Sequence, residues 1–230
     1  LPTTPNGDIS QVPEGEEPIK SAKDLGAPTL AARRPHLRDA TPRGRVLVIG
    51  ASGQACDLHA PSLLSPSPGL VVHVITLSQV GGALVEAFGA RDCIGTYCAT
   101  PVGGMVPFDM GAAASDPDLA DELMMMVRPT LVCVCAGFTW VDGCENDKER
   151  ADRMNASGPA AVAAAARRAG AKVVWYSTDY VFDGKAGPYA ETDTSAPLNV
   201  YGASKLAGEA AVLAADPTAL VIRTNVVYGP

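Results

Sequence analysis

The chain has 230 residues, of which 47% are hydrophobic and 19% are charged, a composition typical of a globular protein with a substantial core. Its formal net charge of −7 disfavours nucleic acid and anionic membrane surfaces as main partners. Every apolar run falls short of the ~20 residues that a membrane-spanning helix needs. We therefore expect a protein that binds neither nucleic acid nor membrane.

The cysteines and histidines predict reduced thiols and no metal site. The six cysteines form no CxxC pair, and the three histidines form no metal-ligand cluster with them. Cys133 and Cys135 stand two apart in an apolar run, so they share one face of a strand and behave as small hydrophobic residues. This usage of cysteine favours an intracellular, cytoplasmic protein.

Residues 1–43 are predicted to be a disordered tail, because they are rich in proline, glycine, serine and charge and lack apolar periodicity. Arginines such as Arg33 and Arg34 are typical of an organelle transit peptide. Acidic residues such as Glu14 and Glu16 oppose that interpretation, since transit peptides are poor in acid. A transit peptide remains the alternative to a plain cytoplasmic tail.

From residue 44 onward, short apolar runs alternate with longer helical patterns. The expected strands span residues 46–49, 92–99, 105–110, 130–137, 171–179 and 219–229. The expected helices span residues 78–90, 117–128, 146–170 and 199–216, the second with Asp116 as its N-cap and Pro129 just beyond its end. Such alternation predicts one α/β domain over 44–230, a doubly wound parallel sheet with helices on both faces. Ligands of such sheets bind beyond the carboxyl ends of the strands.

The first strand runs into Gly50 and Gly53, as a strand does before a phosphate-binding turn. The helix that should follow is delayed, because prolines and serines fill the next stretch. The helical pattern resumes only at residues 78–90.

Residues 55–79 therefore have the character of an insertion within the turn. Removal of these 25 residues joins Gln54 to Val80 and restores a G-x-x-G-x-x-G turn that ends in Gly81. It also places Tyr97 22 residues after the first glycine, close to the ~20 expected of a dinucleotide-binding fingerprint. A retained intron in a gene model and a genuine long loop both remain open.

A second group of residues predicts proton-transfer chemistry. Tyr201 and Lys205 stand four apart on an expected helix and so share one face, while Ser177 and Thr178 end an expected strand. A neighbouring ammonium would lower the pKa of the phenol from ~10, which lets Tyr201 act as an acid or base. Thr178 would bond the substrate carbonyl, and Lys205 the nicotinamide ribose. A solvated helix face is the alternative for the Tyr–Lys pair alone.

Four blocks of sequence resemble the extended short-chain dehydrogenase/reductase superfamily. Within it they are most similar to the dTDP-4-dehydrorhamnose reductases and to their relative, the regulatory beta subunit of methionine adenosyltransferase. The blocks are "YSTDYVFDG" from Tyr176, "PYAETD" from Pro188, "PLNVYGASKLAGE" from Pro197 and "VIRTNVVYG" from Val221. The resemblance implies an NAD(P)-binding Rossmann fold, and it covers about residues 45–230 apart from the insertion.

The resemblance also implies roles for individual residues. It assigns Thr178, Tyr201 and Lys205 to a catalytic triad, with the last two also touching the cofactor. It assigns the remaining cofactor contacts to Gly50, Gly53, Gln54, Val80 and Gly81 in the pyrophosphate turn, Asp109 beside the adenine, and Ala136 and Gly137 after the fourth strand. No acid follows the second strand in "GTYCATPVGG", which favours NADP(H) over NAD(H).

The activity implied is NAD(P)H-dependent reduction of a nucleotide-sugar 4-ketone, in dTDP-rhamnose biosynthesis. The alternative is a non-catalytic, NADP-binding regulatory subunit whose partner is the methionine adenosyltransferase catalytic subunit. The resemblance leaves a homodimer open as the assembly. The family continues into a C-terminal region that covers the substrate, so we expect this substrate region to be truncated at Pro230.

Overall fold

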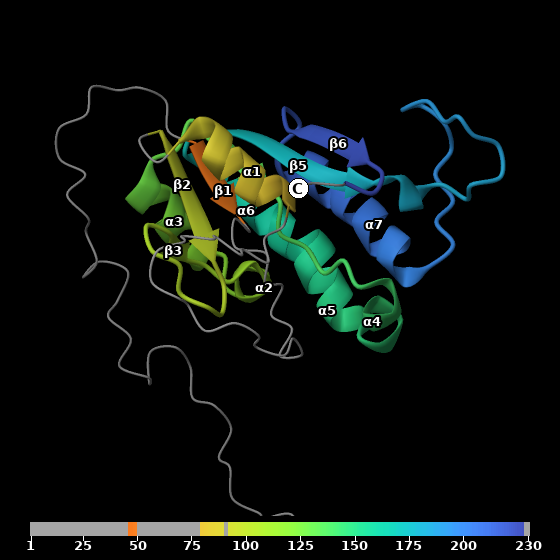
Figure 1. Cartoon of the computed structure of the whole chain (residues 1–230), viewed down its shortest axis with the longest axis horizontal. Helices are drawn as coiled ribbons and strands as arrows, with labels where there is room; N and C mark the ends of the chain where they lie inside the picture. Colours follow the sequence, from red (N-terminus) through yellow and green to blue (C-terminus); the bar gives the residue numbers. More distant parts are fainter. Residues whose placement is uncertain (1–45, 50–78, 90–91, 228–230) are drawn as a thin grey trace, which may run out of the picture. The chain divides into compact units, whose positions relative to one another are not determined.

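A computed structural model of the chain describes residues 46–49, 79–89 and 92–227. Within them, parallel strands form one sheet in the order β3-β2-β1-β4-β5-β6 (Figure 1). The strands are β1 Val46–Ile49, β2 Cys93–Tyr97, β3 Val106–Pro107, β4 Leu131–Val134, β5 Lys172–Thr178 and β6 Leu220–Thr224. The predicted doubly wound parallel sheet is confirmed. The order of the strands reverses between β1 and β4, which is where such sheets bind their ligands.

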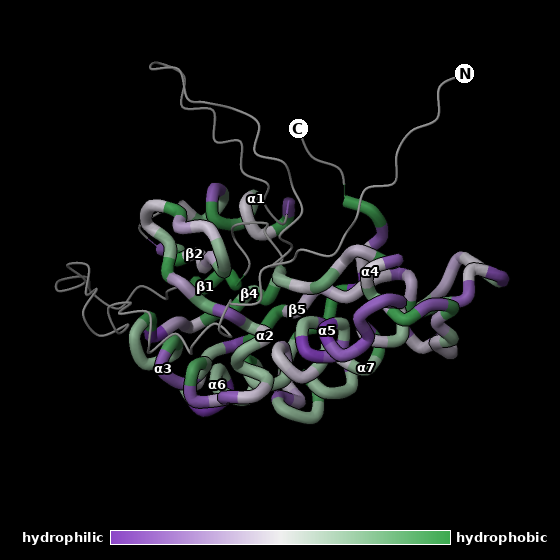
Figure 2. Tube along the Cα trace, turned by 90° about the horizontal axis from the view of Figure 1, so that it is seen from below, coloured by the Kyte–Doolittle hydropathy of each residue, from purple (hydrophilic) through white to green (hydrophobic). Residues whose placement is uncertain are grey.

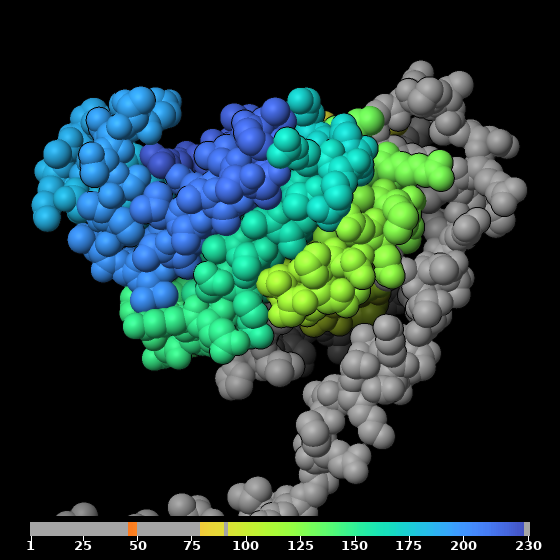
Figure 3. Space-filling view, turned by 180° about the vertical axis from the view of Figure 1, so that it is seen from behind, coloured from red at the N-terminus to blue at the C-terminus, as the bar shows by residue number. Residues whose placement is uncertain are grey.

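Helices cover both faces of the sheet, because alternate residues of each strand point to opposite sides. The helices are α1 Gln79–Phe88, α2 Met110–Ala113, α3 Asp118–Val127, α4 Val141–Asn146, α5 Lys148–Asp152, α6 Gly158–Arg168 and α7 Val200–Ala215. Val46 and Val48 of β1 pack with Leu84 and Val85 of α1 on one face. On the other face, Leu47 and Ile49 of β1 belong to the larger hydrophobic core, to which α2, α3, α6 and α7 also contribute buried side chains. Figure 3 shows α3, α6 and α7 side by side on that second face.

Hydropathy follows these layers. All four residues of β1 are buried, as expected of the central strand of a parallel sheet. By contrast, α5 consists mostly of charged residues and is among the most hydrophilic parts of the tube in Figure 2. None of the helices within the described ranges is long and apolar enough to cross a membrane.

Three local predictions are wrong. Met110, predicted to end a strand, begins α2 instead, because Asp109 accepts a hydrogen bond from the Ala112 amide at 3.1 Å and caps that helix. Asp116 is not a helix cap: the N-cap of α3 is Pro117, with no side-chain hydrogen bond. The helical region expected over 146–170 is broken at Asp147, which ends α4 and caps α5 by accepting a hydrogen bond from the Arg150 amide at 2.9 Å.

The helical region contains a single turn of π-helix, η2 Arg153–Ser157, between α5 and α6. A π-turn adds one residue to the helical repeat and so redirects the side chains around it. Here it leaves Asn155 fully buried. Gly170 then ends the region with a φ of +76°, as the C-terminal glycine of a helix commonly does.

Candidate active site

Helix α7 carries the predicted Tyr–Lys pair, and two features of its first turn fix its place. The Asn199 side chain accepts a hydrogen bond from the Gly202 amide at 2.7 Å, which caps the helix. A side chain at Gly202 would collide with the carbonyl oxygen of Tyr180, so only glycine allows this close approach. Tyr180 belongs to η3 Asp179–Val181, the short 3-10 turn that follows β5. The start of α7 is thereby held against the carboxyl end of β5.

Lys205 lies beneath the site with 4% of its surface exposed. Its ammonium donates a hydrogen bond to the Tyr176 carbonyl at 2.5 Å and lies 4.0 Å from the centre of the Trp175 ring. Burial lowers the pKa of Lys205 to about 7, although the nearby Glu209 carboxylate opposes the shift. The Lys205 side chain therefore contacts β5 and is shielded from solvent, so the alternative of a solvated helix face is wrong for this lysine.

Tyr201 is partly buried one turn earlier on α7. Its ring packs edge-on against Tyr180, with 5.6 Å between ring centres. Burial raises the pKa of the Tyr201 phenol, and a hydrogen bond with Thr178 opposes that rise. The predicted lowering of this pKa by Lys205 is wrong, because the ammonium is turned toward Tyr176 and Trp175. At neutral pH the phenol therefore keeps its proton.

Thr178 is the last residue of β5 and is 6% exposed. Its hydroxyl accepts a hydrogen bond from the Tyr180 amide at 3.2 Å and donates one to a carboxylate oxygen of Asp179 at 3.2 Å. The Thr178 hydroxyl thus caps η3 and is also hydrogen-bonded to the phenol of Tyr201. Thr178, Tyr201 and Lys205, proposed above as a triad, come together at the carboxyl edge of the sheet.

Asn155 is a residue of this site that sequence reasoning missed. Its side-chain oxygen accepts from the Phe138 amide at 2.8 Å, and its amide group donates to the Phe138 carbonyl at 2.9 Å and to the Ser204 hydroxyl at 3.0 Å. It therefore ties the segment after β4 to α7. A Cβ added at Gly137 would lie 3.0 Å from Asn155 and 4.0 Å from the Lys205 ammonium. No pattern in the sequence marks this residue, which lies in the π-turn between α5 and α6.

The predicted cofactor residues fall into three positions. Gly50, Gly53 and Gln54 lie outside the described residues, as do the predicted tail and all but the last residue of the predicted insertion. Val80 and the buried Gly81 lie in the first turn of α1, which begins at Gln79. Ala136 and Gly137 follow β4, and the Ala136 amide donates to the carbonyl of Ile49 at 3.1 Å. That bond places the segment after β4 beside the end of β1.

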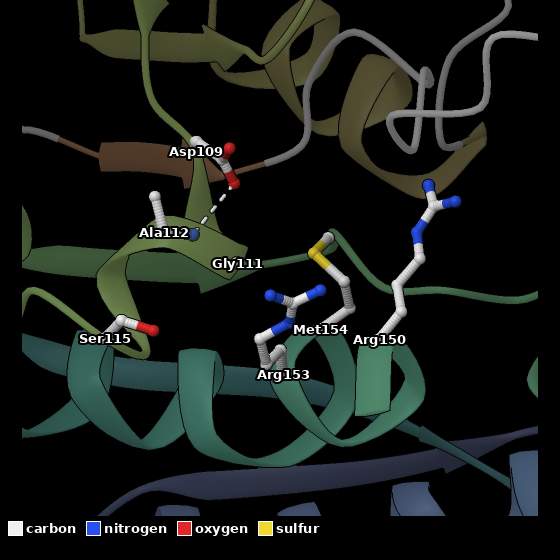
Figure 4. A pocket seen from close by; sticks show the side chains of 7 residues that line it. All are labelled: Asp109, Gly111, Ala112, Ser115, Arg150, Arg153 and Met154. Atoms are coloured by element: carbon white, nitrogen blue, oxygen red, sulfur yellow. Dashed lines mark hydrogen bonds between the residues drawn. The ribbon is translucent and has the colours of Figure 1, made fainter. Parts of the chain in front are cut away.

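Asp109 follows β3 and lines a cavity of about 370 Å³ on the α2 side of the carboxyl edge (Figure 4). Arg150, Arg153 and Met154 line the opposite side, and Figure 4 shows both guanidinium groups rising from α5 and η2. The remaining lining residues are Gly111, Ala112 and Ser115. Two positive charges beside one carboxylate suit a ligand that combines a polar ring with phosphate. Thr178, Tyr201 and Lys205 do not line this cavity.

The burial of Lys205 gives a testable result for stability. Replacement of Lys205 by Met should raise the free energy of unfolding at about pH 6 by ~2–4 kcal/mol, since it removes a charge whose pKa folding has lowered. The gain should shrink as the pH rises from about 7, because the unfolded state then binds more protons than the folded one. Urea titrations over this pH range measure it. The exposed Lys148, changed to Met, is the control and should show no such dependence. A lower stability of the Lys205→Met variant at every pH would contradict the argument.

The comparisons with known proteins agree with this geometry. The family model of the RmlD substrate-binding domain matches residues 76–230. The dTDP-4-dehydrorhamnose reductase of Escherichia coli (strain K12) is 41% identical over 134 residues, which are 56% of this chain and 45% of that protein. The reductase of the same name from Mycobacterium tuberculosis (strain CDC 1551 / Oshkosh) is 47% identical over 119 residues, 50% of this chain and 38% of that protein.

Solved structures give the same result. A hypothetical dTDP-4-dehydrorhamnose reductase from Sulfolobus tokodaii is 30% identical with a TM-score of 0.63, over 80% of this chain and 56% of that one. The dTDP-4-dehydrorhamnose reductase of Bacillus anthracis (strain Ames), solved in complex with NADP, is 29% identical with a TM-score of 0.61, over 82% and 55%. The chain spans about half the length of the curated relatives it matches. Because the family model covers more than half of the sequence, and because the fold agrees, the chain belongs to the RmlD substrate-binding domain family.

Proposed function

We propose that the protein carrying this sequence reduces a nucleotide-sugar 4-ketone with NAD(P)H, as a dTDP-4-dehydrorhamnose reductase. The observation that carries the proposal is the meeting of Thr178, Tyr201 and Lys205 at the carboxyl end of β5. Curated relatives and solved neighbours with this name support it. The protonated phenol of Tyr201 also suits a reduction, in which the enzyme must supply a proton.

The described residues fit a dinucleotide cofactor in two places. Gly81 is buried in the first turn of α1, and because it has no side chain, a ligand could approach the helix backbone closely there. The N-terminus of a helix favours bound phosphate. The cavity beside Asp109 offers a carboxylate for an amino group and two guanidinium groups for phosphate. When bound, the cofactor supplies the hydride that is added to the ketone carbon.

The side chains of this chain supply the remaining parts of the reaction. The Thr178 hydroxyl turns from the Asp179 carboxylate to donate its hydrogen bond to the ketone oxygen, and so orients the carbonyl. Tyr201 transfers its phenolic proton to that oxygen as negative charge develops there, so the ketone becomes an alcohol. Lys205, positively charged below about pH 7, stabilises the phenolate left on Tyr201 once its ammonium turns away from the Tyr176 carbonyl.

NADP(H) is the cofactor that we propose. The residues after β2, from Cys98 to Val102, include no acid that would hold an unphosphorylated ribose. Arg150 and Arg153 add positive charge on the wall of the cavity beside Asp109. The Bacillus anthracis relative, which is in complex with NADP, also supports this preference.

The experiment is a steady-state assay of the protein carrying this sequence with a dTDP-4-keto-6-deoxysugar. We expect NADPH to be oxidised only when this sugar is present, with one 6-deoxyhexose formed for each NADPH, and with a higher kcat/KM for NADPH than for NADH. Tight NADPH binding without turnover, together with co-purification of a methionine adenosyltransferase, would overturn the proposal in favour of a regulatory subunit.

A further inference from the structure

A buried carboxylate that the proposed reaction does not use connects the elements around the site. Glu209 lies one turn after Lys205 on α7 and is 6% exposed. Its carboxylate accepts a hydrogen bond at 2.5 Å from the hydroxyl of Ser177, the residue directly before Thr178. Arg223 of β6 donates to both of its oxygens, from Nε at 2.9 Å and from Nη2 at 2.6 Å. This two-pronged bond also raises the pKa of Arg223.

A long connection leaves the sheet directly after η3, and we call residues 182–195 the arm. Its two ends are joined where the Ala196 amide donates to the carbonyl of Val181 at 2.9 Å. In Figure 1 it is the light-blue excursion between β5 and α7. Because η3 carries Tyr180, which packs on Tyr201, the arm begins beside the proposed proton donor.

The arm has internal structure of its own. The rings of Phe182 and Tyr189 stack with 4.4 Å between centres and an angle of 5° between planes. The Tyr189 hydroxyl donates to Asp183 at 2.6 Å and accepts from the Ala186 amide at 3.0 Å. A closed loop with packed aromatic rings behaves as a unit, so its position depends on the contacts at its base.

Arg223 makes those contacts at three separate positions of the arm. Its guanidinium carbon lies 5.0 Å from the centre of the Phe182 ring. Nη1 donates to the Glu191 carbonyl and Nη2 to the Ser195 hydroxyl, both at 3.4 Å. The same guanidinium therefore contacts the beginning of the arm at Phe182 and its second half at Glu191 and Ser195, while the Glu209 carboxylate holds the guanidinium in place.

We propose that Glu209 and Arg223 are positioning residues that hold the arm at the carboxyl end of β5, where it forms one wall of the nucleotide-sugar site. The proposal rests on the proposed function for the identity of the substrate. The guanidinium is the right group for this task, because its planar fork binds a carboxylate and still presents a face to an aromatic ring. A lysine at the same place could supply the charge alone.

The kinetic test compares Arg223→Lys and Arg223→Met with the unchanged protein. We expect the KM for the sugar nucleotide to rise by about tenfold in Arg223→Met and by less in Arg223→Lys, with the dissociation constant of NADPH unchanged. The control is Arg168→Lys, since Arg168 makes a comparable two-pronged bond to Asp121 on the exposed side of α6. An equal loss of NADPH binding would show a general structural role and would overturn the proposal.

A second measurement follows the arm directly and needs no turnover. Lys185, on the arm, is exposed, so brief trypsin digestion followed by mass spectrometry can measure cleavage after it. We expect faster cleavage there in Arg223→Met and in Glu209→Gln than in the unchanged protein or in Arg168→Lys. Unchanged cleavage in folded Arg223 variants would overturn the proposal even if the protein is an active reductase. Faster cleavage in a protein without reductase activity would support the anchoring and reject only the substrate assignment.

Discussion

Replacement of Tyr201 by Phe is expected to lower the turnover of the proposed reduction by ~10² or more, the loss typical of a missing general acid. The dissociation constant of NADPH should change little. Phe keeps the ring that packs against Tyr180, so the change removes the hydroxyl and its bond with Thr178 and little else. Steady-state kinetics with the sugar nucleotide, and a direct NADPH titration, measure the two effects separately.

The neighbouring tyrosine provides a matched control. Tyr180 makes the other half of the same ring contact but is 42% exposed, and no step of the proposed reaction uses its hydroxyl. Tyr180→Phe should therefore retain turnover within about threefold of the unchanged protein. Full turnover by Tyr201→Phe would show that the phenol is not the proton donor. Equal losses in both variants would point to the ring contact and not to the proton.

The fold and the approximate site could be predicted from local patterns. Alternating strands and helices determine a parallel sheet, and a spacing of four residues places Tyr201 and Lys205 on one helix face whatever surrounds that helix. The direction of the Lys205 ammonium could not be predicted in this way. It depends on Trp175 and on the carbonyl of Tyr176, which reach it from β5. The pKa of Tyr201 was predicted in the wrong direction, because the burial that raises it also depends on tertiary packing.

The residues missed by sequence analysis act across long separations in the chain. Asn155 reaches its partners because a π-turn shifts its direction, and no pattern of hydrophobic residues marks where such a turn falls. Glu209 and Arg223 meet only once α7 and β6 have both packed on β5. Pairings of this kind are set by tertiary structure, so composition and periodicity cannot reveal them.

Removal of residues 55–79, joining Gln54 to Val80, is expected to strengthen NADPH binding by at least a hundredfold. In the structure β1 ends at Ile49 and α1 begins at Gln79. In the joined chain only a short turn connects these two elements. It also keeps the sequence of the helix, because Gln54 then stands where Gln79 stood. Both the strand and the helix should therefore form as before.

In the sequence as given, residues 55–79 separate Gly53 from Gly81, so we expect the amide groups of the turn and those at the start of α1 not to bind the same pyrophosphate. A charge-assisted hydrogen bond to phosphate contributes ~1.5–3 kcal/mol, and two such bonds amount to ~3–6 kcal/mol, or a factor of at least ~10² in affinity. Calorimetric titration of NADPH into both chains measures the difference. A third chain, with residues 55–78 replaced by a glycine–serine linker of equal length, separates the effect of length from that of sequence. It should bind as weakly as the original chain. Equal affinity of all three would mean that the long connection leaves Gly81 in place at the pyrophosphate, and that residues 55–79 are a tolerated loop.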